Sequence, residues 1–313
     1  MPLDGAQVSA VPATVRSKHS FPQRNLLFLL LVALSVAVFW ASLKMVLGYQ
    51  FWGDSENDEY FCTLVAPVFS LALVLIERHW IFSRVRYGIR PGTVLLLLGV
   101  LLRIVAGAAS RQIGSELSIS IDLLGLVTFG IGAFILCYGT LAFQAGRFPL
   151  LFLLAAVPLP SPVFETLLAV VRAGSAEVSG FLFSLSGVPV LRNGMDFSLP
   201  DVTIRVERAC SGIHSTLAIV LVSLIAAHLF LASAWRKLLL VLAAVPIVCI
   251  TNGCRIAGLT LLAQYVNRQF LYGNLHHHGG IGFFALALLL LYLVLQLLRI
   301  GTPQASPRVE RSL

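Results

Sequence analysis

The sequence is poor in charged residues and lacks a disulfide framework. Only 12% of its 313 residues are charged, whereas soluble domains carry about 25%. Hydrophobic residues make up 58%, and the mean hydropathy is +0.90. So little charge excludes a soluble fold, a disordered chain and a coiled coil. The five cysteines are odd in number and lie mostly in apolar runs, so they are not paired as in a secreted scaffold. We therefore predict an all-α, polytopic membrane protein.

Long apolar runs predict about eight transmembrane helices, because about 20 mostly apolar residues cross the hydrocarbon core. The predicted spans are residues 25–44, 61–79, 92–109, 121–143, 147–160, 211–233, 237–260 and 280–299. The expected organisation is an N-terminal tail (1–24), an N-terminal transmembrane half (25–146), a second transmembrane half (147–300) and a C-terminal tail (301–313).

The basic residues indicate the orientation of these spans. With the N-terminus inside, the cytoplasmic segments hold 13 Lys and Arg residues and three acidic ones. Such a bias is typical of the cytoplasmic side. The net charge of +8 is therefore a topology signal, and we expect no nucleic-acid partner. We predict a protein of the cytoplasmic (inner) cell membrane with both termini in the cytoplasm. Arg103, near a predicted span end, is expected to reach the headgroups.

One long segment, residues 158–210, is predicted to lie outside the membrane. Apolar residues recur at helical spacing over 163–185 and are interrupted by charged and small residues, which is typical of an amphipathic helix on a membrane surface. The Asn193-Gly194 pair then predicts a turn, and alternation over residues 202–207 predicts a small hairpin leading to Cys210.

Three polar clusters interrupt apolar helices: residues 208–215, 252–255 and 276–280. Polar groups at membrane depth are costly and usually functional. Cys210 begins one span on the outer side, Arg255 comes near the outer end of the next, and His276 begins the last. The predicted topology thus places a thiol, a guanidinium and an imidazole at one outer depth, and these groups form a workable set for acyl transfer.

Five short motifs in chain order resemble signatures of the exosortase/archaeosortase family, which comprises membrane-embedded cysteine transpeptidases. They are Pro158-Leu-Pro160, Gly187-Val-Pro189-Val, Ala209-Cys-Ser-Gly-Ile213, Asn252-Gly-Cys-Arg255-Ile, and His276 followed by Gly280 and Phe284. The resemblance runs from about Leu150 to Leu290. The N-terminal half is similar only in hydropathy and over residues 60–71, where Phe61-Cys62 follows Tyr60 in place of the histidine that family members often carry.

The resemblance implies Cys210 as the nucleophile, Arg255 as an electrostatic stabiliser and His276 as the general acid/base, so residues 147–300 form the expected catalytic half. The adjacent His277 and His278 remain alternatives to His276, which the spacing to the following glycine and phenylalanine favours.

Four further residues are candidates for a supporting role. His214 lies one helical turn after Cys210. It is either an alternative proton carrier or a residue that supports the reacting groups without touching the substrate. Asn252 belongs to the arginine motif, and Glu207 and Arg208 precede the cysteine.

The resemblance also implies the substrates: proteins that end in a short motif, a hydrophobic span and a basic tail. The expected activity is cleavage of this C-terminal sorting signal through a thioester and transfer to an acceptor, on the extracytoplasmic side and in contact with membrane lipid. We expect no cofactor and no metal, and a zinc site of the histidines with Cys210 is a disfavoured alternative. The rival function is a non-enzymatic membrane component of a polysaccharide-export or secretion system. A transporter is disfavoured because no internal repeat is visible.

Overall fold

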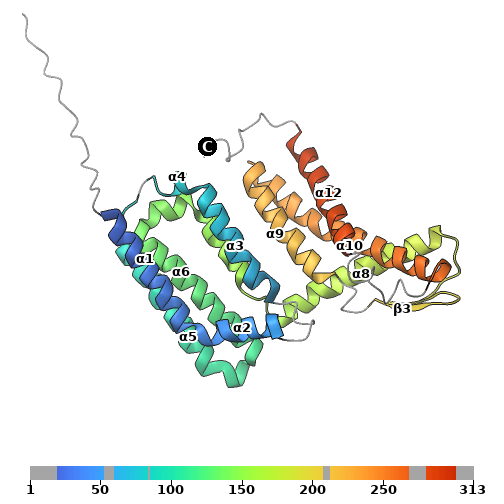
Figure 1. Ribbon diagram of the computed structural model, residues 1–313, viewed down its shortest axis with the longest axis horizontal. Helices are drawn as coiled ribbons and strands as arrows, with labels where there is room; N and C mark the ends of the chain where they lie inside the picture. The colour runs from blue at the N-terminus through green and yellow to red at the C-terminus, as the bar shows by residue number, and fades with distance from the viewer. Residues whose placement is uncertain (1–19, 53–59, 84, 207–211, 268–279, 301–313) are drawn as a thin grey trace, which may run out of the picture.

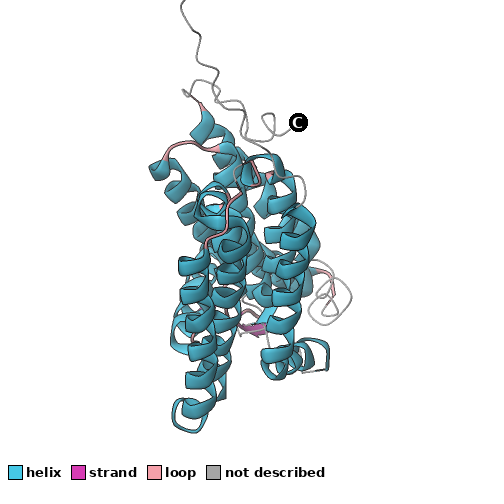
Figure 2. Cartoon of the chain, turned by 90° about the vertical axis from the view of Figure 1, so that its left-hand side faces the viewer, coloured by secondary structure: helices cyan, strands magenta, loops and turns pink. Residues whose placement is uncertain are grey.

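The computed structural model describes residues 20–52, 60–83, 85–206, 212–267 and 280–300. Figure 2 shows that this part of the chain is almost entirely helical, with one small patch of strand. The elements in Figure 1 are α1 (Ser20–Val38), α2 (Trp40–Trp52), α3 (Phe61–Ile76), α4 (Arg78–Ile81), α5 (Ile89–Ile113), α6 (Ser115–Ala145), α7 (Arg147–Phe152), α8 (Ser161–Leu185), β1 (Leu191–Asn193), β2 (Asp196–Ser198), β3 (Thr203–Arg205), α9 (Ile213–Phe230), α10 (Ala234–Tyr265) and α12 (Gly280–Arg299). The predicted all-α polytopic membrane fold is confirmed.

In the part of the chain that the structure describes, fewer helices than the predicted eight are long and apolar enough to cross a membrane. Within the described residues, six helices are long and apolar enough, and the bent pair α1–α2 would make seven. The predicted spans 61–79 and 147–160 form shorter apolar helices, Phe61–Ile76 and Arg147–Ala156. Conversely, α8, predicted as an amphipathic surface helix, is long and apolar enough to count as a candidate span. Length and composition alone therefore do not distinguish a surface helix from a crossing one.

The helices form two groups, which lie side by side in Figure 1. The first contains α1 to α6, and the second contains α9, α10 and α12. In the first group α6 is the central helix, and 67% of its most apolar stretch is buried inside the protein. The corresponding stretches of α5 in the first group and of α12 in the second are only 17% buried. Their exposed leucines and valines would be costly in water and are matched to lipid.

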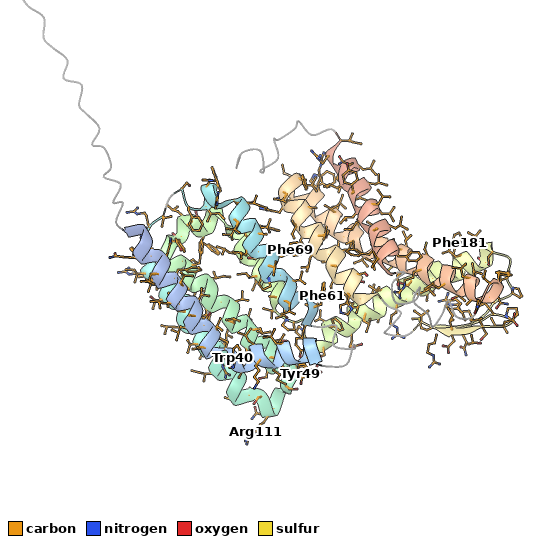
Figure 3. The ribbon with its side chains drawn as sticks, in the orientation of Figure 1. Trp40, Tyr49, Phe61, Phe69, Arg111 and Phe181 are labelled. Carbon is orange, nitrogen blue, oxygen red and sulfur yellow. The ribbon has the colours of Figure 1, made fainter. Side chains whose placement is uncertain are left out.

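The bend between α1 and α2 is held by a polar cluster. The two helices meet at 67°. Near the bend, Ser42 donates a hydrogen bond to Asp122 of α6. Arg103 of α5 lies 3.5 Å from the Asp122 carboxylate and 3.4 Å from the carbonyl oxygen of Val38. Arg103 therefore has a partner within the bundle, a buried carboxylate on the neighbouring helix that the sequence did not indicate. That it reaches the headgroups stays a prediction. Figure 3 shows Trp40 at this bend.

A buried polar contact joins the two groups at the upper end of Figure 1. His228 Nε2, near the end of α9, lies 2.7 Å from Glu77 Oε1, which follows α3. Both side chains are about 6% exposed. The His228 ring also stacks on Phe148 with a centroid distance of 3.8 Å. The two halves of the chain are thus joined by a hydrogen-bonded polar contact as well as by apolar packing.

The predicted hairpin is present and is extended by a third strand. β1 and β2 pair across Asn193 and Asp196, and β3 pairs antiparallel with β2 in the order β1-β2-β3. Arg205 donates two hydrogen bonds to Asp196 and holds the pKa of that carboxyl below its ordinary value. A depressed carboxyl pKa means that this ion pair stabilises the sheet at neutral pH and is lost as the pH falls through that pKa.

Helix α8 connects the sheet to the helical groups. In Figure 1 it crosses the lower ends of α3 and α9 and continues along the second half of α10 to the sheet. Its buried face contributes Ala176 and Phe183 to a core with Phe197, Val206 and Ile256. The first half of α10, by contrast, packs against α9 and α12 through residues that include Leu240, Ala244 and Ile247.

The crossing of α8 and α10 depends on small residues. A Cβ on Gly253 would lie 2.6 Å from Cβ of Val178, and a Cβ on Gly174 would lie 2.6 Å from Sγ of Cys249. Small residues let helices approach closely in membrane proteins. This close contact determines where the motif carried by α10, residues 252–255, sits relative to α8.

Candidate active site

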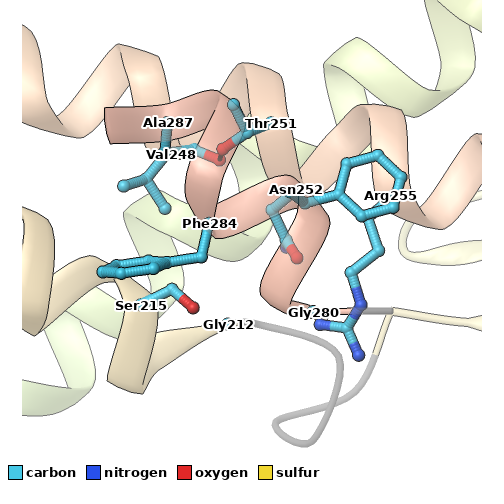
Figure 4. Close-up of a pocket in the computed structure, with 10 residues that line it drawn as sticks. Gly212, Ser215, Val248, Thr251, Asn252, Arg255, Gly280, Phe284 and Ala287 are labelled. Atoms are coloured by element: carbon cyan, nitrogen blue, oxygen red, sulfur yellow. Dashed lines mark hydrogen bonds between the residues drawn. The ribbon is translucent and has the colours of Figure 1, made fainter. Parts of the chain in front are cut away.

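A small pocket lies where three helices converge (Figure 4). Its wall is formed by the start of α9, the middle of α10 and the start of α12. The lining residues are Gly212, Ser215, Val248, Thr251, Asn252, Arg255, Gly280, Phe283, Phe284 and Ala287. Described members of all three sequence clusters, or residues directly beside them, therefore line one pocket.

The contribution of α10 follows from helical periodicity. Val248, Thr251, Asn252 and Arg255 are spaced at intervals of three and four residues, so they share one face. Gly280, Phe283, Phe284 and Ala287 repeat this spacing on α12. In Figure 4 the side chains of Asn252 and Arg255 extend from α10 in the same direction, toward the glycines that begin the neighbouring helices. The pocket thus combines an apolar wall of α12 with a polar wall of α10.

Asn252 is held firmly although it lies at the pocket. Its side chain is buried, and its Nδ2 donates a hydrogen bond of 3.0 Å to Ser175 Oγ on α8. The polar side chain is thereby tied to the helix behind it. Arg255, about one helical turn further along α10, is partly exposed. A group that enters the pocket can therefore contact this residue.

Gly212 begins α9 in a conformation that favours glycine. Its φ is +61°, and it occupies the N-cap position of the helix. A Cβ there would lie 3.2 Å from Asn252 Oδ1. Glycine is therefore required both by the left-handed backbone and by the approach of the asparagine.

Replacing Gly212 with alanine is expected to lower both stability and activity. The left-handed conformation costs an ordinary residue about 1–2 kcal/mol, and relief of the contact would displace Asn252 or the start of α9. Thermal unfolding in detergent and processing of a substrate protein measure the two effects. Gly258→Ala is the matched control, because a Cβ on Gly258 of α10 meets no atom within 4 Å. Equal behaviour of the two variants would contradict the requirement for glycine.

Several predicted site residues lie outside the part of the chain that the structure describes. They are Glu207, Arg208, Cys210, His276, His277 and His278. Of the predicted set, the structure describes His214, Asn252 and Arg255. Asn252 and Arg255 line the same pocket, whereas His214 is not among the residues given above for it.

His214 instead contacts the N-terminal half of the chain. Its exposed ring meets Phe61 of α3 edge-to-face, with a centroid distance of 5.4 Å. Figure 3 shows Phe61 at the end of α3 that approaches α8. Phe61 follows Tyr60, at the position where the sequence departs from the family resemblance described above. The departure noted in the sequence therefore lies directly against a candidate supporting residue.

The four cysteines that the structure describes are free thiols. Cys137 and Cys249 are buried, and Cys62 packs among apolar side chains. Cys254 is partly exposed, but it is not among the residues that line the pocket. Cys62, Cys137 and Cys249 are therefore packing residues in this fold. Within the described ranges, no group of three His, Cys, Asp or Glu side chains is placed to hold a metal ion.

Sequence reasoning missed the polar residues that support the pocket from α8 and α10. Thr251 lines the pocket, and Ser175 holds Asn252. Ser175 is 0% exposed. The available signal was a hydroxyl on the buried face of an otherwise apolar helix. That signal is weak, because serine and threonine commonly bond to their own helix backbone.

The fold and the pocket together define a polytopic membrane protein with a polar site built where membrane helices begin. The family model described as Transmembrane exosortase (Exosortase_EpsH) matches residues 52–293, which is most of the chain. The chain belongs to the transmembrane exosortase family, whose members are membrane transpeptidases of protein sorting. No curated protein and no solved structure matches the chain significantly.

Proposed function

We propose that this exosortase cleaves C-terminal sorting signals of exported proteins with Cys210 as the nucleophile, Arg255 as the electrostatic stabiliser and His276 as the general acid/base. The observation that carries the proposal is the single pocket lined by Gly212, Arg255 and Gly280. It brings the starts of α9 and α12 to the arginine-bearing face of α10.

Chain connectivity supports the assignment of the thiol and the imidazole. Cys210 lies two residues before Gly212 in the sequence, and an extended chain spans at most about 3.6 Å per residue, so their Cα atoms are at most about 7 Å apart. By the same measure, His276 lies at most about 14 Å from Gly280. Chain connectivity is therefore compatible with an approach of both candidates to the pocket that Arg255 lines.

The reaction would proceed in two acyl transfers. The Cys210 thiolate attacks the carbonyl carbon of the scissile peptide bond, and Arg255 stabilises the negative charge that develops on the carbonyl oxygen. His276 donates a proton to the leaving nitrogen, the C–N bond breaks, and a thioester remains. The acceptor nucleophile then loses its proton to His276, attacks the thioester carbonyl and releases the thiolate.

The distribution of charge supports an extracytoplasmic site. Arg236 at the start of α10 donates a hydrogen bond of 2.9 Å to Leu298 O at the end of α12, so these two ends lie together. In Figure 1 they share the upper end of the molecule with the start of α1 and with α4. This end carries Arg24, Arg78, Arg236 and Arg299. By the positive-inside rule it lies in the cytoplasm, and the pocket at the opposite end then faces outward.

The proposed substrate fits this placement. A protein with its own transmembrane helix would present the peptide bond just outside that helix at the depth of the pocket, with its basic tail left on the cytoplasmic side. The cleaved product would then pass to an acceptor.

Hydroxylamine trapping tests the proposed thioester. Membranes containing this chain and a tagged protein with such a C-terminal signal are incubated with hydroxylamine, which attacks thioesters in place of the acceptor. We expect the tagged product to end in a hydroxamate at the cleaved bond, detected by its mass. A product that carries only a free carboxylate at every hydroxylamine concentration would contradict a thioester intermediate.

A further inference from the structure

Helix α8 presents a line of polar side chains toward the two segments that form the site. Arg172, Ser175 and Ser179 are spaced by three and four residues, so they lie on one side of the helix. Ser175 and Ser179 are 0% exposed. Buried polar groups of this kind require partners. Arg172 and Ser175 find theirs on other elements, and Ser179 bonds to Ser175 O of its own helix and also contacts Gly253 O of α10.

One of these serines holds α10 at the arginine motif: Ser175 Oγ accepts a hydrogen bond from Asn252 Nδ2. Ser179 Oγ lies 2.8 Å from Ser175 O of its own helix and 3.2 Å from Gly253 O of α10, so it also contacts α10 at this level. Both contacts fall within the turn that leads to Arg255. Ser175 therefore ties this turn of α10 to α8.

Arg172 holds the other segment. Its Nε and Nη2 donate hydrogen bonds of 3.1 and 2.8 Å to one acceptor, the carbonyl oxygen of Val206. Val206 is 0% exposed and lies just after β3. It is four residues before Cys210 in the sequence. A guanidinium is planar, so two donors on one oxygen restrict the direction as well as the distance of the contact.

We propose that Arg172 is a positioning residue, which through the Val206 carbonyl fixes the chain that enters the Cys210 motif relative to the α10 face that carries Arg255. The inference rests on the function proposed above. The contacts made by α8 would define the separation of the nucleophile from its stabilising cation, because one helix holds both segments. Arg172 acts through the backbone and does not touch the reacting atoms.

A second arginine offers a matched control. Arg192 of β1 also ties the sheet to α8, through hydrogen bonds of 3.0 and 2.6 Å to the carboxylate of Glu177. That contact is exposed and lies on the strand of the sheet farthest from Cys210 in the sequence. Loss of either arginine weakens the docking of the sheet on α8, but only Arg172 contacts the residue that leads into the cysteine motif.

The test combines kinetics with the reactivity of Cys210. Processing of a tagged substrate is measured in membranes for Arg172→Ala, Arg172→Lys and Arg192→Ala. Alkylation of Cys210 by iodoacetamide is followed by mass analysis of its peptide from roughly pH 5 to pH 10, a range that spans the titration of activated and ordinary thiols.

We expect Arg172→Ala to lower kcat by about tenfold to hundredfold with KM changed less than about twofold, the effect of misplacing a reacting group by about 1 Å. The alkylation midpoint should rise toward about 8.5, the value of an ordinary thiol. Arg172→Lys should recover only part of both losses, because it keeps the charge but not the planar pair of donors. Arg192→Ala should leave the midpoint unchanged.

Three results would overturn the proposal. The first is an unchanged alkylation midpoint in Arg172→Ala, because a loss of stability lowers the amount of folded protein and does not move a midpoint. The second is full recovery in Arg172→Lys, which would assign the effect to charge alone. The third is an equal midpoint shift in Arg192→Ala. If Arg172→Ala does not accumulate in membranes, the alkylation midpoint of Arg172→Lys is compared with that of Arg192→Ala instead.

Failure of the proposed function gives a different outcome. If Cys210 of the unaltered chain reacts with the midpoint of an ordinary thiol and Cys210→Ala still processes substrate, the assignment of the nucleophile is wrong. If the unaltered chain shows an activated Cys210 and Arg172 has no influence on it, only the inference about Arg172 fails.

Discussion

Processing of a tagged substrate is expected to fall by more than about 10³-fold in Cys210→Ala, because the covalent route is lost when its nucleophile is removed. The same variant should yield no hydroxamate with hydroxylamine. The accumulated substrate should keep its basic tail, which mass analysis of the tagged protein detects.

Two other cysteines supply controls for this prediction. Cys254 adjoins Arg255 in the sequence and is a partly exposed free thiol, and Cys62 packs near the start of α3. Cys254→Ala and Cys62→Ala are expected to process the substrate at a rate close to that of the unaltered chain. If Cys210→Ala retains activity and either control variant loses it, the nucleophile is a residue other than Cys210.

Replacement of Arg255 is expected to have the next largest effect. Arg255→Gln removes the positive charge from the polar wall of the pocket, and loss of one group that stabilises an oxyanion costs about 10²–10³ in kcat. KM should change little, because the charge develops only in the transition state. Arg255→Lys should recover part of the rate, since an ammonium is a point charge without the fork of donors.

Arg236→Gln is the matched control for Arg255. Arg236 is carried by the first turn of the same helix and hydrogen-bonds to Leu298 O. It should not influence the chemical step. Kinetics of tail removal over a range of substrate concentrations separate kcat from KM in both variants. A normal kcat in Arg255→Gln, or a loss expressed only in KM, would exclude the assigned role.

The sequence identifies the polar residues of the candidate site, but it indicates only some of the contacts that support them. Cys210, Arg255 and His276 stand out because polar groups interrupt long apolar runs, and such groups are costly in a membrane. Among the described residues, Gly212, Arg255 and Gly280, one from each cluster, line one pocket. The roles of Cys210 and His276 stay predictions, since these residues lie outside the described part of the chain.

The span count shows where pattern reading reached its limit. Residues 147–160 are apolar and are predicted to cross the membrane, but the structure has a helix of ten residues, Arg147–Ala156. Hydropathy measures how well a segment tolerates lipid. It does not determine the length of the helix or the direction in which the segment runs.

The amino-acid sequence by itself determined the membrane class, the position of most helices and the identity of the polar groups, because these properties depend on local composition and period. Tertiary structure decided which partners those groups have. Arg103 finds Asp122, Arg172 finds the Val206 carbonyl, and Ser175 finds Asn252 at a separation of 77 residues in the chain. A helical period shows which residues share a face, but the neighbour of that face depends on the close approach of α8 and α10 at Gly174 and Gly253.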